Sequence, residues 1–337
     1  MEKIEKRSHQ DLDVIGIGNA IVDVLIQVEE SSLEELSFQK GCMTLVDETQ
    51  AELLYKRFNP NVITSGGSAA NTLACIAQLQ GSCGFIGRVK NDELGEIFTK
   101  QIISAGAKFE TPASTTGPST ARCLILVTPD AQRTMCTYLG ASIFLEPEDL
   151  DLQAIKQSKV LYLEGYLWDN PSAKNAFITA AQIAKENKKK VSLSLSDAFC
   201  VERHRESFLE LIQNHIDILF TNEAEIKSLY RTSNLDNAIQ KVKGICEITA
   251  ITLGEKGSIL LTKDQQIPIE PYSLGPLIDT TGAGDLYAGG FLKGFTEGLD
   301  LFKCGQIGSL CAGHIVTQLG PRTQKSLVEL VKTHEKY

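Results

Sequence analysis

The sequence lacks the features that would place it in a membrane, outside the cell or on nucleic acid. No run approaches the ~20 apolar residues of a membrane-spanning helix, and the opening MEKIEKRSHQDLD holds no apolar stretch like that of a signal peptide. Basic residues are outnumbered, with 33 Lys and Arg against 42 Asp and Glu, whereas nucleic-acid-binding domains usually carry clustered Lys and Arg. We expect a soluble, cytoplasmic protein that binds neither membrane nor nucleic acid.

Cysteine is present, but not in a pattern typical of metal sites or disulfide frameworks. The nine Cys form no CxxC pair, are odd in number, and several lie in apolar runs such as CLILV and SLCAG. This pattern predicts buried free thiols. Internal repeats and low-complexity segments are also absent, and 42% of the 337 residues are hydrophobic, which is enough for a sizeable core.

Short apolar strands alternate with helical segments along most of the chain. Strand-like runs occur at 14–19, 83–89, 160–165, 191–196, 217–222 and 249–254. Such alternation implies βαβ units. The sequence therefore predicts an α/β fold with a doubly wound, mainly parallel sheet and helices on both of its faces.

Two segments interrupt the alternation, at 24–48 and 108–140, and both read as strands with few helical signals. In the second, TPDAQ is typical of a hairpin turn. The two segments flank a helix–strand–helix region at 50–106. We predict that they meet as a small discontinuous β-sheet lid beside a large domain made of 1–23, 49–107 and 141–337.

The strongest chemical signal is DTTGAGD, from Asp279 to Asp285, which precedes a helix-like run. A glycine-rich turn at a helix N-terminus presents unpaired amides and the positive end of the helix dipole to phosphate oxygens. Thr280 and Asp285 could instead simply cap a helix, because both residue types favour caps. A carboxylate beside a phosphate-binding turn is better explained if it handles a proton or a metal.

Several motifs in a fixed order resemble the ribokinase-like, or phosphofructokinase-B, family of carbohydrate and purine kinases. Besides DTTGAGD they are SGGSAAN (65–71), GRVKNDELG (87–95), TNEAE (221–225) and TLGEKGS (252–258). The resemblance covers nearly the whole chain. It implies a kinase that uses ATP and Mg²⁺, with a monovalent cation such as K⁺ in part of the family.

The same resemblance assigns roles to individual residues. It makes Asp285 the general base and the amides of Gly282, Ala283 and Gly284 an anion hole for the transferring phosphoryl group. Asn222 and Glu225 would organise phosphate and Mg²⁺, with Glu225 as the metal residue. The sugar site would comprise Gly66, Gly67, Ser68 and Asn71, and the nucleotide site Thr252, Gly254, Gly257, Thr280 and a lid cation, Arg133.

The acceptor is read from the segments GNAIVDV, SGGSAAN, RTMCTYLGA and EGYLWD, which together look most like bacterial adenosine kinases. Asp23, with Asn19 beside it, would hold the ribose hydroxyls, because an ionised Asp accepts two hydrogen bonds from a cis-diol. Tyr166 and Trp168 could border a flat base, or Leu167 could be the contact instead. Arg122 is a lesser cation candidate, and Ser309 stands where many relatives have Asn, which leaves the adenine contacts of ATP open.

The expected reaction is transfer of phosphate from MgATP to the 5′-hydroxyl of adenosine, giving AMP and ADP. The alternatives are a kinase of the same family acting on ribose, another nucleoside or a ketose phosphate, and a non-catalytic nucleoside sensor. A dinucleotide-dependent oxidoreductase is disfavoured, because GIGNAI lacks the third glycine of GxGxxG. Either a monomer or a homodimer is compatible with the sequence.

Overall fold

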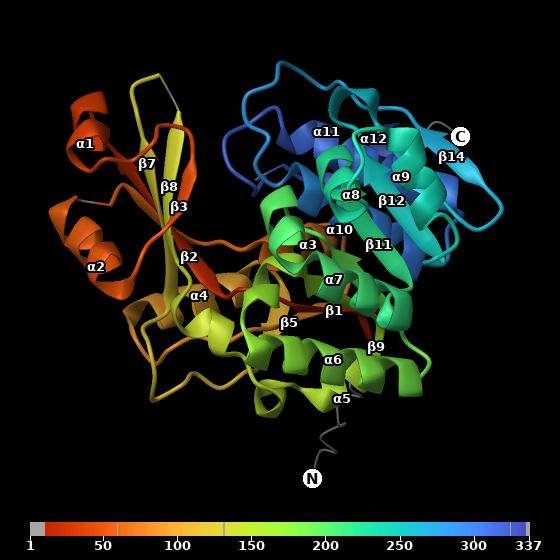
Figure 1. Ribbon diagram of the computed structural model, residues 1–337, viewed down its shortest axis with the longest axis horizontal. Helices are drawn as coiled ribbons and strands as arrows, with labels where there is room; N and C mark the ends of the chain where they lie inside the picture. Colours follow the sequence, from red (N-terminus) through yellow and green to blue (C-terminus); the bar gives the residue numbers. More distant parts are fainter. Residues whose placement is uncertain (1–10, 59, 131, 324, 335–337) are drawn as a thin grey trace, which may run out of the picture.

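A large β-sheet runs through the body of the molecule in the computed structural model, which describes residues 11–58, 60–130, 132–323 and 325–334 (Figure 1). Six neighbouring strand pairs are parallel, and the last two strands join as antiparallel hairpins. The order is β14 (Gln266–Ile269), β13 (Ser258–Leu261), β12 (Ile248–Thr252), β11 (Ile218–Asn222), β10 (Lys190–Ser194), β9 (Ser158–Glu164), β1 (Leu12–Ile17), β5 (Cys83–Ile86) and β6 (Ala107–Phe109).

Helices cover both faces of this sheet, because its strands are apolar on both sides. Successive residues of a strand point to opposite faces: Val14 packs into one core cluster, and its neighbour Ile15 packs into the other. The first face carries α3 (Ser68–Gln78), α4 (Glu93–Ser104), α10 (Ala283–Thr296), α11 (Leu301–Ile315) and α12 (Leu327–His334). The second carries α5 (Leu152–Gln157), α6 (Pro171–Glu186), α7 (Ala198–His215), α8 (Glu223–Leu229) and α9 (Leu235–Val242). The predicted doubly wound α/β fold is confirmed.

The second sheet forms the lid at the left of Figure 1. Its order is β3 (Met43–Leu45), β8 (Arg133–Tyr138), β7 (Ala121–Val127), β2 (Ile21–Gln27) and β4 (Val62–Ser65), with α1 (Glu30–Glu35) and α2 (Glu48–Arg57) beside it. Strands β7 and β8 pair as an antiparallel hairpin. The sequence predicted this hairpin, although Ala131 in its turn lies outside the described residues.

The predicted lid segments differ from the observed lid sheet in three places. β4 pairs with β2 although it lies outside both predicted segments, and β6 belongs to the large sheet although it lies inside the second. The segment 24–48 also contains helix α1, which has an acidic residue in its first turn and buries Leu33; an acidic residue there interacts favourably with the helix dipole. A strand can pair with another strand that lies far away in the sequence, so the local sequence pattern did not reveal these pairings.

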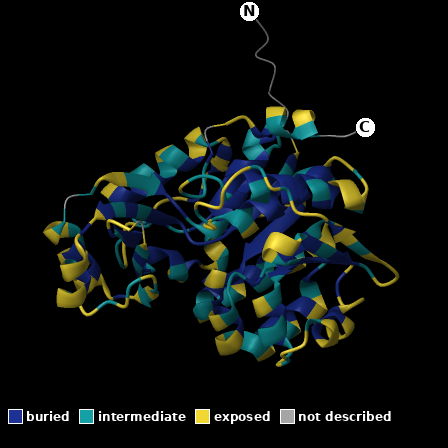
Figure 2. Ribbon diagram, turned by 90° about the horizontal axis from the view of Figure 1, so that it is seen from above, coloured by how far each residue is buried: buried dark blue, intermediate teal, exposed yellow. Residues whose placement is uncertain are grey.

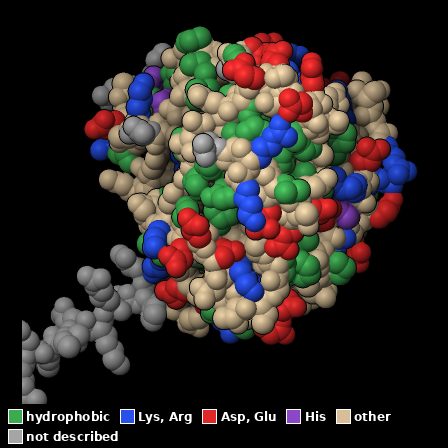
Figure 3. Space-filling view, turned by 90° about the vertical axis from the view of Figure 1, so that its left-hand side faces the viewer, with side chains coloured by type: hydrophobic (Ala, Val, Ile, Leu, Met, Phe, Trp, Pro, Cys, Tyr) green, Lys and Arg blue, Asp and Glu red, His purple; other side chains and the backbone are tan. Residues whose placement is uncertain are grey.

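Buried residues fill the interior around the sheets, and exposed residues lie at the outside of the helices and loops (Figure 2). All nine Cys are free, and eight of them are buried, as expected. On the lid side, acidic and basic side chains of the described residues are interspersed (Figure 3). None of the described helices is both long and apolar enough to cross a membrane.

Candidate active site

The DTTGAGD segment forms the turn that leads into α10, as predicted. Gly282 is the residue before the helix and has a left-handed backbone, with φ of 80°, a conformation that favours glycine. A Cβ on Gly282 would also lie 2.5 Å from the Cβ of Pro321. The turn therefore needs glycine at this position both for its backbone conformation and for space.

The amides of this turn are only partly free. The Ala283 N–H donates to the Thr280 carbonyl at 3.1 Å, whereas those of Gly282, Gly284 and Asp285 have no partner among the described residues. The anion hole expected from Gly282, Ala283 and Gly284 is corrected accordingly: Ala283 closes the turn, and the available donors are those of Gly282, Gly284 and Asp285. Space beside Gly284 is open, since a Cβ there would meet nothing within 4 Å.

The carboxylate of Asp285 lies in the first turn of α10 and is held by helix α3. The Ser68 hydroxyl donates to Oδ1 at 2.6 Å, and the Asn71 amide donates to Oδ2 at 3.0 Å. Burial raises the pKa of Asp285 to about 6, and the hydrogen bonds from Ser68 and Asn71 oppose that rise. Ser68 and Asn71, expected to contact the sugar, thus orient the predicted base.

The glycines of SGGSAAN let a lid strand approach the start of α3. A Cβ on Gly66 would lie 2.3 Å from Oδ2 of Asp23, and one on Gly67, whose φ is 97°, would lie 2.5 Å from the Asn19 carbonyl oxygen. Asp23 is a residue of strand β2 in the second sheet, whereas the sequence had placed residues 1–23 in the large domain. Burial raises its pKa to about 7, and Arg322 and Arg133 oppose that rise. Strand β2 therefore brings a carboxylate to the edge of the same site.

Asn19 belongs to a buried hydrogen-bond network. Its amide donates to Glu164 at 2.7 Å, and its carbonyl accepts from the Ser142 hydroxyl at 2.8 Å. The other Glu164 oxygen accepts from the Ala69 amide in the first turn of α3, at 2.8 Å. Asn19, expected to bind substrate, also ties the end of β1 to the start of α3 through Glu164.

Arg133 connects the second sheet to the DTTGAGD turn. Its guanidinium pairs with Asp279 at 3.0 Å, and Asp279 also accepts from the amides of Thr281 and Gly320. The lesser candidate, Arg122, is buried between the rings of Tyr55 and Tyr138. Arg133 is thus the sequence-predicted lid cation that the structure brings to the site.

Asn222 and Glu225 form a reciprocal cap at the start of α8. The Asn222 side chain accepts from the Glu225 amide, and both Glu225 oxygens accept N–H groups of Asn222. Burial raises the pKa of Glu225 to about 7. No group of three or more His, Cys, Asp or Glu side chains in the described part of the chain could hold a metal by itself. This arrangement suits an ion held mainly by phosphate and water, as is usual for Mg²⁺.

The hairpin predicted to line the nucleotide site follows β12. Thr252 ends that strand, Gly254 and Gly257 have φ of 61° and 81°, and η4 (Gly254–Lys256) lies between them. Thr280 is exposed at the start of the phosphate turn. Ser309 donates to the Glu270 carbonyl at 2.8 Å, so its hydroxyl is used inside the protein.

The segment that follows β9, residues 165–169, has one partly exposed aromatic residue and two residues buried in the core. Tyr166, in η3 (Gly165–Asp169), remains 36% exposed. Leu167 is fully buried, and Trp168 packs on Phe177 and Phe208. Leu167 and Trp168 therefore belong to the core and are ruled out as base contacts. Side chains that follow the end of a buried strand often complete the packing around that strand.

Sequence reasoning missed two residues of this site, Glu164 and Arg322. A carboxylate that ends a buried strand was the signal for Glu164, which lies in the segment EGYLWD. The signal for Arg322 was its place in Gly-Pro-Arg, in the loop that follows α11. Arg322 donates from Nε to the Asn71 carbonyl oxygen at 3.2 Å.

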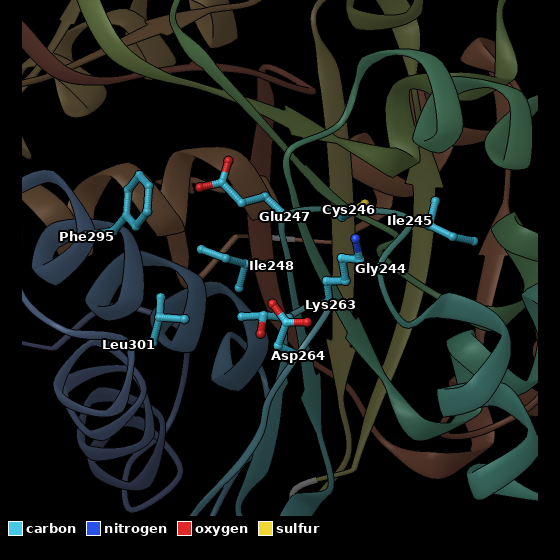
Figure 4. A pocket seen from close by; sticks show the side chains of 10 residues that line it. Gly244, Ile245, Cys246, Glu247, Ile248, Lys263, Asp264, Phe295 and Leu301 are labelled. Atoms are coloured by element: carbon cyan, nitrogen blue, oxygen red, sulfur yellow. The ribbon is translucent and has the colours of Figure 1, made fainter.

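A cavity of about 520 Å³ lies elsewhere, at the amino end of β12 (Figure 4). It is lined by Glu247, Lys263, Asp264, Phe295 and Leu301 among others. It contains none of the predicted site residues. The predicted residues instead gather where the parallel strands end, which is the usual ligand edge of such sheets.

We expect Gly66→Ala to destabilise the protein, because its methyl group would displace the Asp23 carboxylate. Overpacking of this kind costs about 1–3 kcal/mol, which urea denaturation would measure as a lowered midpoint. The matched control is Gly284→Ala, where a Cβ meets nothing within 4 Å, and we expect a change within about 0.5 kcal/mol. Equal stability of the two variants would contradict the packing of Asp23 on Gly66.

Comparisons with known proteins find relatives over most of the length of this chain. The profile described as pfkB family carbohydrate kinase matches residues 43–327. The chain is 45% identical to the adenosine kinase of Sinorhizobium meliloti, covering 96% of this chain and 99% of that one, with a TM-score of 0.88. A probable sugar kinase from Rhizobium etli is 42% identical, with coverages of 96% and 98% and a TM-score of 0.89. The adenosine kinase of Saccharomyces cerevisiae is 26% identical over 91% of this chain and 96% of its own length.

Proposed function

Because the chain belongs to the pfkB family of carbohydrate kinases, we propose that it transfers the γ-phosphoryl group of ATP to the 5′-hydroxyl of adenosine. The products are AMP and ADP. The observation that carries the proposal is the Asp285 carboxylate, held by two donors from α3 beside the free amides of the GAG turn. The similarity to the Sinorhizobium meliloti adenosine kinase supports adenosine as the acceptor.

Asp285 aligns the hydroxyl and accepts its proton. Ser68 and Asn71 occupy one lone pair on each carboxylate oxygen, and a carboxylate retains further acceptor sites. A carboxylate is a weak base toward an alcohol, so the proton moves late, once bond formation has acidified the hydroxyl. Since phosphoryl transfer has a loose transition state, placement of the hydroxyl contributes more than basicity.

The charge on the transferring phosphoryl group is balanced by fixed donors. The amides of Gly282, Gly284 and Asp285 point from the positive end of the α10 dipole. Arg133 supplies a positive charge from the lid, next to the same turn. Mg²⁺, when bound with ATP, neutralises phosphate oxygens. Asn222 and Glu225 would hold the Mg²⁺ ion, because Asn222 lies beside Thr252, at the start of the hairpin that follows β12. A monovalent cation such as K⁺ near the turn remains part of the proposal.

Asp23 holds the ribose, and Tyr166 borders the adenine of the acceptor. Asp23 comes from lid strand β2, so binding of the ribose draws the lid onto the large domain. The Arg133–Asp279 ion pair fastens the opposite end of the lid to the phosphate turn. Closure of this kind excludes water that would otherwise accept the phosphoryl group. The active unit is a monomer or a homodimer.

The acid side of the pH profile of kcat/KM should show two ionisations, because both Asp23, with a pKa of about 7, and Asp285, with a pKa of about 6, must be ionised. The step assigned to Asp285 is the fall of activity as the pH drops through 6. In Ser68→Ala, loss of the stabilising hydrogen bond raises the pKa of Asp285, so the fall should begin at higher pH. A profile that does not move in this variant would show that Asp285 is not the titrating group.

An ADP-release assay with MgATP and a panel of acceptors tests the function. The panel comprises adenosine, inosine, guanosine, ribose and fructose 6-phosphate. Preferential turnover of adenosine is the expected result. Preference for a free sugar would favour a sugar kinase of the same family. ATP binding without turnover of any acceptor would favour a nucleoside sensor.

A further inference from the structure

Arg322 belongs to a loop that fastens the C-terminal part of the chain onto the candidate site. The loop joins α11 to α12 and contacts the site at three points. The Gly320 amide donates to Asp279 at 2.8 Å, Pro321 packs against Gly282, and Arg322 donates to Asn71 at 3.2 Å. The Arg322 guanidinium is thereby placed between the phosphate turn and the residue that orients Asp285.

Most of the hydrogen-bonding capacity of this guanidinium is unused. Its Nη2 group is shielded from solvent and has no partner among the described residues, although a guanidinium carries five N–H donors. The carboxylates of Asp23 and Asp285 are its charged neighbours, yet neither forms an ion pair with it within 4.0 Å in the described structure. A buried donor left without an acceptor is costly, so this arrangement implies an acceptor that arrives with the ligand.

The geometry points to a phosphate oxygen as that acceptor, and we propose that Arg322 binds the phosphoryl group as it reaches the nucleoside. This inference rests on the proposed function. During transfer the bond between the 5′-oxygen and phosphorus forms, and the bond between phosphorus and the leaving ADP oxygen breaks with its electron pair going to ADP. The hydroxyl proton goes to Asp285, and Arg322 keeps its protons throughout, contributing charge and two parallel donors.

Arg322 and Arg133 therefore have different roles in the site. Arg133 belongs to the lid and is paired with Asp279, so its charge is shared with a carboxylate and depends on lid position. Arg322 belongs to the large domain and has a free buried donor. We infer that Arg322 remains beside Asp285 whether or not the lid closes, and that it holds the 5′-phosphate of the product.

The test compares Arg322→Met with Lys325→Met, which removes an exposed charge from the same loop. In Arg322→Met we expect kcat to fall about 10²-fold and the Kd of AMP to rise at least about 10-fold, as for loss of charged hydrogen bonds. The Kd of adenosine, which has no phosphate, should change less than about threefold. Lys325→Met should change none of these values. Arg322→Lys, which keeps the charge but loses the planar fork, should lie between wild type and Arg322→Met, and it serves if Arg322→Met does not fold.

Two outcomes would overturn the proposal. The first is an equal loss of affinity for AMP and adenosine, which would indicate a structural role. The second is an absence of any effect of Arg322→Met on kcat in an Asn71→Ala background, which would mean that Arg322 acts only through Asn71. Failure of the proposed function is separate, because wild-type protein would then turn over another acceptor of the panel. The phosphorylated product of that acceptor would replace AMP in the same comparison.

Discussion

Replacing Asp285 with Asn should lower kcat at least about 10²-fold, the range typical of a positioned proton transfer. An amide keeps the size of the carboxylate but cannot accept the hydroxyl proton, and it presents a donor to the donors of Ser68 or Asn71. Adenosine affinity should change little, because the contact between Asp285 and the 5′-hydroxyl is only one of several contacts to the ribose. Steady-state kinetics together with calorimetric adenosine binding would separate the two quantities.

The matched control for this variant is Asp264→Asn, in the exposed turn between β13 and β14. It makes the same chemical change away from the site and should leave kcat unaltered. Near-normal turnover of Asp285→Asn would remove Asp285 from its proposed role. A collapse of adenosine binding would instead assign Asp285 to holding the nucleoside.

Replacing Asp23 with Ala should raise the KM for adenosine at least about 100-fold while kcat changes much less. The carboxylate accepts two hydrogen bonds from the ribose diol, and bonds to a charged group contribute about 1.5–3 kcal/mol each. Burial raises the pKa of Asp23 to about 7, and a protonated carboxyl accepts fewer hydrogen bonds. In the wild type, KM should therefore rise as the pH falls below 7.

A substrate lacking one hydroxyl supplies the control for Asp23. With 2′-deoxyadenosine, wild type and Asp23→Ala should differ less than they do with adenosine, because one of the two hydrogen bonds is already absent. An equal rise in KM for both nucleosides would indicate that Asp23 acts by supporting Gly66 and the start of α3. Binding of the diol would then be assigned elsewhere.

The architecture of the large sheet could be predicted because its information is local. Each parallel strand is a short apolar run, buried on both faces, and each is followed by an amphipathic helix. The lid was located only in part, since pairing of β4 with β2 joins residues about 40 positions apart and leaves no periodic trace. The helix at α1 was missed because its six residues are too few to establish a helical period.

The same division applies to the site. The motif around Asp285 predicted a helix start and a carboxylate there, since glycine conformation and capping are local effects. Which donors reach that carboxylate is not local: Ser68 lies 217 residues away in the chain, and Asn71 lies 214 away. The sequence could not decide between Tyr166, Leu167 and Trp168 as the base contact, because apolar and aromatic residues at strand ends have the same sequence pattern whether they face a ligand or the core.

By itself, the sequence determined the α/β class, the glycine-rich turn with its GAG motif, and the presence of Asp285 at the start of a helix. Only the tertiary structure decided which amides remain free, which residues hold Asp285, and that Arg133 and Arg322 come to the same turn from distant parts of the chain. The physical reason is that backbone conformation depends on near neighbours, whereas charge pairing and desolvation depend on whichever groups folding brings within a few ångströms.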